Sequence, residues 1–187
     1  MKELSLNVLD IAMNSVKAKA SLIEITINET DEEMSISISD NGCGMTKEIL
    51  QNVSDPFCTT RKTRKVGLGI PFFRLAAEQT GGSLEIESVS ELDDSVNHGT
   101  TTTAHFFKDH LDFTPLGDII STYCTLVQSS DGFDVVFTHI LPNGEKIEAD
   151  TRAFREILGD VPLSNPDVLM WIKGFLQEQY SITKAIQ

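Results

Sequence analysis

Hydrophobic and polar positions in the first 107 residues follow helix and strand periods in turn. A three-to-four-residue period over 5–20, carried by Leu6, Leu9, Met13 and Val16, predicts an amphipathic helix. Strict alternation over 23–27 and again over 34–38 predicts two strands joined as an antiparallel hairpin. The pattern then predicts further elements: a short helix over 46–52, a helix from 67 to about 79, and strands over 84–89 and 100–107.

Strands and helices in this order, without regular β-α-β alternation, are typical of an α+β fold. We therefore expect a mixed, mainly antiparallel sheet with its helices on one face. The basic segment 53–65 has no clear period and is expected to be a loop.

The residues from 108 onward predict a second, smaller α+β region. Its elements are a helix over 116–127, a hairpin around Pro142-Asn143-Gly144, a short helix near 154–158 and a last helix from 164. We expect two units, an N-terminal domain over 1–107 and a C-terminal region over 108–187. The sequence assigns no role to the second unit, and leftover apolar surface there would suit a homodimer.

Charge and cysteine usage narrow the classes of function. Fifteen basic and 28 acidic residues give a net charge of −13, which disfavours binding to nucleic acid. The three cysteines form no Cys-x-x-Cys pair, and no segment reaches the roughly 20 apolar residues of a membrane helix. The acidic N-terminal residues, without an apolar run, are not expected to act as a signal peptide. A cytoplasmic protein without membrane contact is expected.

Asp10 and Asn14 are one turn apart on the first predicted helix and project from the same face. A carboxylate and an amide oxygen so placed suit a hard cation such as magnesium. A solvated polar face explains the same pair, and this helix alone favours that reading.

Two glycine-containing segments would allow a ligand to approach the backbone closely, while a tight turn after Asp40 and a solvated basic loop over 61–65 explain the same residues. Asp40 leaves a strand and enters a turn with Gly42 and Gly44, where the absence of Cβ atoms allows close backbone approach. Gly67-Leu68-Gly69 opens a helix just after Arg61, Lys62, Arg64 and Lys65, which are concentrated in an otherwise acidic chain. A helix N-terminus with nearby cations favours phosphate.

The order of the motifs carries a resemblance to a known family. The segments are L-D-I-A-M-N-S at 9–15, D-N-G-C-G-M at 40–45, D-P-F-C-T-T-R at 55–61, G-L-G-I at 67–70 and H-G-T-T-T at 98–102. Together they resemble the GHKL ATPases, which include gyrase, heat-shock chaperones, histidine kinases and MutL. The resemblance covers about residues 1–107 and is strongest to the histidine kinase catalytic domain. It implies the two-layer Bergerat fold with ATP and Mg²⁺ as ligands.

The family's roles carry over to matching positions. Asn14 corresponds to the magnesium-holding asparagine, and Asp10 to the position of a general base. Asp40 corresponds to the aspartate that accepts a hydrogen bond from the adenine amino group. The remaining nucleotide contacts implied by the resemblance are Gly42, Gly44, Met45, the lid cations Arg61 and Lys62, Gly67, Leu68, Gly69 and Thr100.

Two functions remain open at this stage. One is an enzyme that transfers the γ-phosphoryl group of ATP to a separate protein or slowly to water, with Asp10 as base and Arg61 and Lys62 stabilising the developing charge. The other is an ATP-gated binding module with little turnover, which presents a surface to a protein partner. A self-contained histidine kinase is not expected, because no histidine here lies in a phosphoacceptor helical hairpin.

Overall fold

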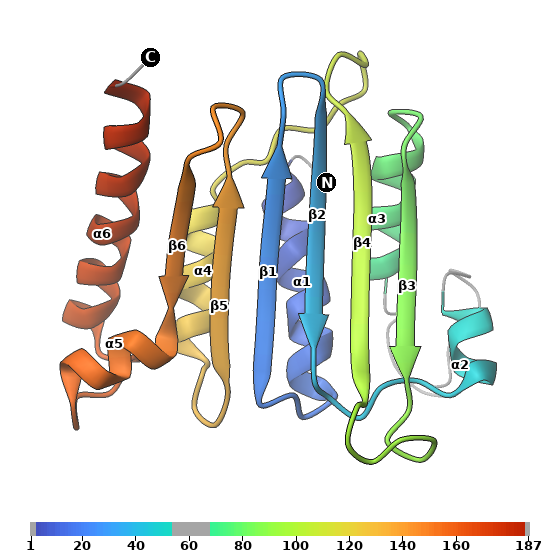
Figure 1. Cartoon of the computed structure of the whole chain (residues 1–187), viewed down its shortest axis with the longest axis horizontal. Coiled ribbons are helices and arrows are strands. Elements are labelled where there is room, and N and C mark those ends of the chain that lie inside the picture. Colours follow the sequence, from blue (N-terminus) through green and yellow to red (C-terminus); the bar gives the residue numbers. More distant parts are fainter. Residues whose placement is uncertain (1–2, 54–67, 186–187) are drawn as a thin grey trace.

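A computed structural model describes residues 3–53 and 68–185. Its elements follow the predicted order along the chain (Figure 1). They are α1 (Leu4–Lys17), β1 (Leu22–Glu29), β2 (Glu33–Asp40), α2 (Lys47–Asn52), α3 (Gly69–Glu78), β3 (Ser83–Val89), β4 (Gly99–Phe107), α4 (Ile119–Gln128), β5 (Asp134–Ile140), β6 (Lys146–Asp150), α5 (Thr151–Leu158) and α6 (Pro166–Ala185).

The strands form one six-stranded sheet in the order β3-β4-β2-β1-β5-β6. Every neighbouring pair is antiparallel except β1 and β5, which run parallel. The expected β1–β2 hairpin is present, with Ile25 opposite Ile38. The predicted α+β class with a mixed, mainly antiparallel sheet is therefore confirmed.

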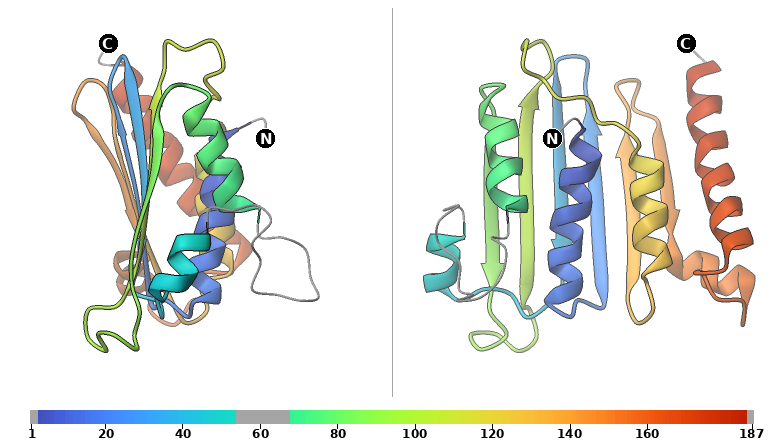
Figure 2. Two further views of the ribbon diagram at one scale, coloured as in Figure 1. Left: turned by 90° about the vertical axis from the view of Figure 1, so that its right-hand side faces the viewer. Right: turned by 180° about the vertical axis from the view of Figure 1, so that it is seen from behind.

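The helices α1, α3 and α4 cover one face of the sheet, and the other face is open (Figure 2). Alternation along the strands explains this two-layer arrangement, because the even-numbered apolar residues of β2 and the odd-numbered ones of β1 point to the helices. The open face carries polar cross-strand pairs, such as Ser37 with Thr103 at 3.1 Å and Ser39 with Thr101 at 2.9 Å. The core therefore lies between the sheet and the helices.

The first helix buries a different stripe from the one that its sequence suggested. Leu4 and Val8 are completely buried, whereas Leu6 is 44% exposed. The helix also ends at Lys17 instead of continuing to residue 20. It ends there because Lys19 adopts a left-handed backbone with φ of 59°, which a continuing helix does not allow.

The sheet continues across the expected boundary at residue 107. β5 pairs with β1 over seven positions, from Leu22 opposite Asp134 to Asn28 opposite Ile140. At the outer edge, the side-chain amide of Gln179 on α6 accepts from the Glu148 backbone N–H at 3.0 Å and donates to its carbonyl at 2.9 Å. One sheet therefore joins the two parts of the chain. The division into two units stays a prediction.

A polar cluster also joins the two parts. The Nε2 of His139 on β5 lies 3.1 Å from Glu29 Oε2 on β1, and its Nδ1 lies 2.8 Å from the Tyr180 hydroxyl on α6. Lys108 donates to Glu29 Oε1 at 2.6 Å. The hydrogen bond with His139 is the main cause that lowers the pKa of Glu29, and Lys108 adds to it against the opposing effect of burial.

Within the described ranges, no helix combines the length and apolar character needed to cross a bilayer.

Candidate functional site

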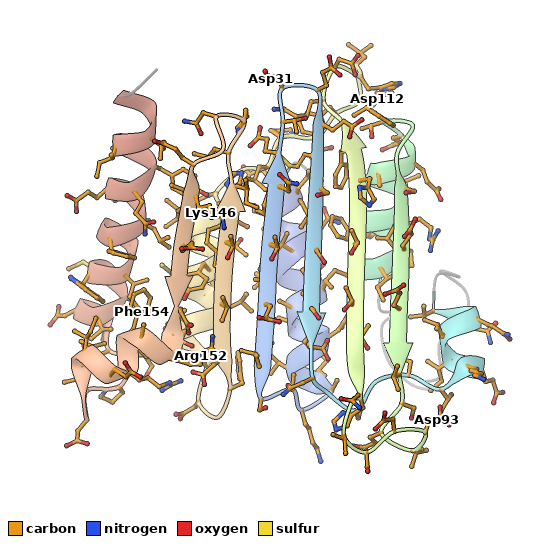
Figure 3. All side chains as sticks on the ribbon, viewed as in Figure 1. Asp31, Asp93, Asp112, Lys146, Arg152 and Phe154 are labelled. Atoms are coloured by element: carbon orange, nitrogen blue, oxygen red, sulfur yellow. The ribbon has the colours of Figure 1, made fainter. Side chains whose placement is uncertain are left out.

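Three polar side chains form a row across the end of the sheet where β2 and β3 finish and β4 begins. In the strand register Asp40 is opposite Thr100, and Thr100 is opposite Ser88. All three alternate in phase with the buried residues of their strands, so they point to the helix-covered face. The β3–β4 loop, marked by Asp93 in Figure 3, extends from this same end. Residues far apart in sequence thus share one site.

Asp40 is held as a hydrogen-bond acceptor by two donors. The Ser15 hydroxyl on α1 donates to its Oδ2 at 2.5 Å, and the Gly42 backbone N–H donates to its Oδ1 at 2.9 Å. Ser15 is 3% exposed, whereas Asp40 keeps part of its surface open. The carboxylate is therefore fixed in place, and the exposed part of its surface can still accept a hydrogen bond from a ligand.

The two glycines of the turn after β2 are required by close packing within the protein. A Cβ at Gly42 would lie 2.8 Å from the Ala18 Cβ, and one at Gly44 would overlap the Val89 carbonyl oxygen. Gly44 also has φ of 63°, a backbone conformation that L side chains rarely adopt. These contacts press the turn against both α1 and β3, and they place Met45 so that its N–H bonds the Ser88 hydroxyl at 2.8 Å.

The exposed face of α1 meets the start of α3. Asp10 and Asn14 are both exposed and lie one turn apart on α1, as predicted. The amide oxygen of Asn14 accepts a hydrogen bond from the Lys17 side chain at 3.4 Å. A Cβ at Gly69 would lie 3.1 Å from the Asp10 Cβ, so the first residue of α3 packs directly beside Asp10. Leu68, the N-cap residue, has an apolar side chain that cannot cap the helix. Among the described residues, no side-chain cap bonds the start of α3, where Gly69 and Ile70 carry N–H groups and Pro71 has none.

The predicted phosphate contacts are covered only in part. Arg61, Lys62 and Gly67 lie outside the described residues. Leu68 and Gly69 are described, and α3 begins at Gly69, two residues after the predicted start at 67. Asp10, Asn14, Asp40, Gly42, Gly44, Met45 and Thr100 all lie on α1 or around this end of the sheet, as described above.

Sequence reasoning gave no role to three residues that shape the site. Ser15 and Ser88 contact Asp40 and Thr100, and His98 places its Nδ1 2.6 Å from the Gly42 carbonyl oxygen. Periodicity could have placed Ser15 on the inner face of α1 and Ser88 in phase with the inward residues of β3. His98 opens the H-G-T-T-T motif at 98–102, which by itself gave this residue no role.

The loop that carries His98 is held by its own hydrogen bonds. The Asp94 carboxylate accepts from the backbone N–H groups of Asn97 at 3.0 Å and Val96 at 2.8 Å. Both bonds lower the pKa of Asp94, and the bond from Asn97 has the larger effect. The ionised carboxylate therefore organises the turn that brings His98 to the Gly42 carbonyl.

None of the four histidines lies on a helix. His98 is in the β3–β4 loop, His105 on β4, His110 in the turn after β4 and His139 on β5. His139 is 3% exposed and both of its ring nitrogens are bonded. All four histidines thus lie on strands or in loops, and the absence of a phosphoacceptor histidine stays a prediction.

Comparison with known sequences supports the family resemblance. Residues 1–110 match the model of the "Histidine kinase-, DNA gyrase B-, and HSP90-like ATPase" family. The histidine-protein kinase AtoS of Escherichia coli is 30% identical over 89 residues, which are 48% of this chain and 14% of AtoS. The sensor histidine kinase ZraS of Klebsiella oxytoca is 34% identical over 83 residues, 43% of this chain and 18% of ZraS. Sporulation kinase C of Bacillus subtilis is 33% identical over 82 residues, 43% of this chain and 19% of that kinase. The chain thus matches only a small part of each of these longer proteins.

A solved structure, the N-terminal domain of a DNA repair protein, has the same fold. It superposes with a TM-score of 0.58 at 17% identity and covers 79% of this chain and 52% of its own chain. That coverage exceeds the 110 residues of the family match, so part of the C-terminal region belongs to the shared fold. The family match spans more than half of the 187 residues and includes the whole row of polar residues. The chain therefore belongs to the family of histidine kinase-, DNA gyrase B- and HSP90-like ATPases.

Proposed function

We propose that this chain binds ATP with magnesium and transfers the γ-phosphoryl group to a separate protein or, slowly, to water. The observation that carries the proposal is the fixed Asp40 carboxylate, which lies in register with Thr100 beneath α1 and is aligned by Ser15 and Gly42. Asp10, Asn14 and the uncapped start of α3 lie on the same helix layer. These features support one nucleotide site with a purine end at Asp40 and a phosphate end near Asp10.

Adenine selectivity follows from the chemistry of Asp40. Its carboxylate oxygens accept hydrogen bonds from Ser15 and Gly42, so it offers only acceptors to a ligand. The amino group of adenine can donate to it, whereas guanine presents an acceptor oxygen at the same position. Leaving such a pair unmade costs about 1–3 kcal/mol, roughly ten- to a hundredfold in affinity. ATP and ADP should therefore bind better than GTP.

The residues of α1 fit a magnesium ion that is held mainly by its ligand. Asn14 and Asp10 offer oxygens from one exposed helix face, and hard cations prefer oxygen. Within the described ranges, no group of three His, Cys, Asp or Glu side chains could form an all-protein metal cage. Magnesium usually takes only one or two protein ligands and completes its shell from phosphates and water, which matches this arrangement.

The phosphoryl-transfer step assigns a role to each nearby group. A magnesium ion held by Asn14 would supply positive charge to the phosphates. Asp10 lies beside the start of α3, where it would accept a proton from the attacking hydroxyl or water. Arg61 and Lys62 would stabilise the charge on the transferred group, as their place in the sequence motif implies.

A regulatory module with little turnover is the second candidate function. One observation favours it: Asp10 is exposed, and no hydrogen bond or ion pair from another described residue orients its carboxylate. A general base is ordinarily oriented by a neighbouring group. In this candidate ATP binding itself changes the surface offered to a protein partner.

Binding and turnover are tested with one set of variants. Calorimetry with Mg-ADP and Mg-ATP should show binding to the native protein, and Asp40→Asn should weaken it at least tenfold because an amide presents an N–H to the amino group of adenine. Asp31→Asn is the control, since Asp31 lies at the far end of the sheet (Figure 3). Absence of any binding heat with folded protein would refute the proposal.

Turnover is followed with γ-labelled ATP, with and without extract from the source cells. Label on a second protein supports the kinase, and free phosphate that Asp10→Asn abolishes supports the ATPase. Binding without either product supports the regulatory module.

A further inference from the structure

The hydroxyl of Ser88 has three hydrogen-bond partners at the end of the sheet. It accepts from the Met45 backbone N–H at 2.8 Å and donates to the Gly99 carbonyl oxygen at 3.0 Å. It also lies 2.8 Å from the hydroxyl oxygen of Thr100. Ser88 therefore connects the turn after β2 to the beginning of β4.

Counting hydrogens fixes the direction of the third bond. A serine hydroxyl has one hydrogen to donate and two lone pairs that accept. The hydrogen of Ser88 is used by Gly99 and one lone pair by Met45, so only a lone pair remains for Thr100. All three bonds form together only when Thr100 is the donor. Thr100 then has no hydrogen left and offers only acceptor lone pairs to other groups.

Asp40 and Thr100 present acceptors side by side in this arrangement. They are direct register partners, and side chains at such positions have Cβ atoms about 4.5–5.5 Å apart on one face of the sheet. Two adjacent acceptors suit a purine with an amino group at position 6, which has two hydrogens to donate. They disfavour an oxo group at that position, which has none.

We propose that Ser88 is a specificity-determining residue that makes Thr100 an acceptor and so strengthens the preference for 6-aminopurines over 6-oxopurines. This inference rests on the proposed nucleotide site and adds to the discrimination by Asp40. Ser88 acts through Thr100 and need not touch the base itself. Without its hydroxyl, Thr100 would be free to turn its hydrogen toward an oxo group.

The test compares ADP and IDP, which differ at position 6 of the purine and in the hydrogen that hypoxanthine carries on N1. Dissociation constants are measured by calorimetry with magnesium for the native protein and for Ser88→Ala, Ser88→Cys and Ser88→Thr. We expect Ser88→Ala to lower the ratio of IDP to ADP dissociation constants about three- to tenfold, the range of one ordinary hydrogen bond. Ser88→Thr keeps a hydroxyl and should restore the native ratio. Ser37→Ala is the matched control, since Ser37 makes a similar bond to Thr103 on the open face.

The ratio separates base selection from a merely structural role. If Ser88 only supported the turn, Ser88→Ala would weaken ADP and IDP equally and the ratio would stay unchanged, which would overturn the inference. Ser88→Cys gives the same comparison if Ser88→Ala does not fold, because a thiol is a weak hydrogen-bonding group of similar size. A native protein that binds neither nucleotide would contradict the proposed function instead.

Discussion

Gly44 provides a sharp test of how the turn after β2 supports the proposed nucleotide site. The change Gly44→Ala has two effects, a strained backbone and a steric overlap. The backbone effect comes from φ of 63°, and the overlap arises because the new Cβ meets the Val89 carbonyl oxygen. Gly144→Ala isolates the first effect, since Gly144 has φ of 83° but no atom within 4 Å of an added Cβ.

The expected losses follow from the contacts at each position. A left-handed backbone costs an alanine about 1–2 kcal/mol, so Gly144→Ala should lower the free energy of unfolding by that amount. At Gly44 the overlap also pushes residues 43–45 away from β3. This breaks the bond from Met45 N–H to Ser88 and the 2.9 Å bond from Glu91 N–H to the Cys43 carbonyl. Two such bonds add about 2 kcal/mol, for a total of about 3–4 kcal/mol.

Urea unfolding gives the two free energies, and calorimetry with Mg-ADP gives the affinities. We expect Gly144→Ala to bind ADP like the native protein and Gly44→Ala to lose binding. Equal destabilisation of the two variants would show that the overlap with β3 is relieved without cost. Native ADP affinity in Gly44→Ala would refute the role of this turn in the site.

Three further predictions concern the rest of the fold. Gln179→Ala should lower the free energy of unfolding by roughly 1 kcal/mol, because it removes the hydrogen bonds to the Glu148 backbone on the outer strand. Gln177→Ala, at an exposed position of the same helix, should not, and denaturant titration compares the two variants. Because the pKa of Glu29 is lowered in the folded state, mainly by His139, its stabilising effect is complete above the ordinary value of 4.5 and is lost as the pH falls toward the lowered value. Glu29→Gln should therefore flatten the acid limb of the stability profile measured by circular dichroism. Fluorescence of Trp171, the single tryptophan, and far-UV circular dichroism should report one common urea transition if the continuous sheet unfolds as a unit. Two separate midpoints would instead support independent units divided near residue 107.

The sequence determined the elements and most of the site chemistry. Alternation in 23–27 and 34–38 predicted β1 and β2 because one face of each strand is buried and the other is not. Asp10 and Asn14 were placed on one helix face by the 3.6-residue period alone. The family resemblance predicted that Asp40 and Thr100 contact one ligand, although the sequence did not show that they are neighbours in the sheet.

Tertiary structure decided everything that depends on pairing between distant segments. The apolar residues of 5–20 suggested a stripe through Leu6, but packing against the sheet buried Leu4 and Val8 instead, because the position of the sheet chooses among several apolar faces. The parallel pairing of β5 with β1 joined the C-terminal region to the first sheet, and local patterns carry no information about such long-range partners. The row of Asp40, Thr100 and Ser88 likewise exists only after three strands align, so the sequence supplied its residues while the register assembled them.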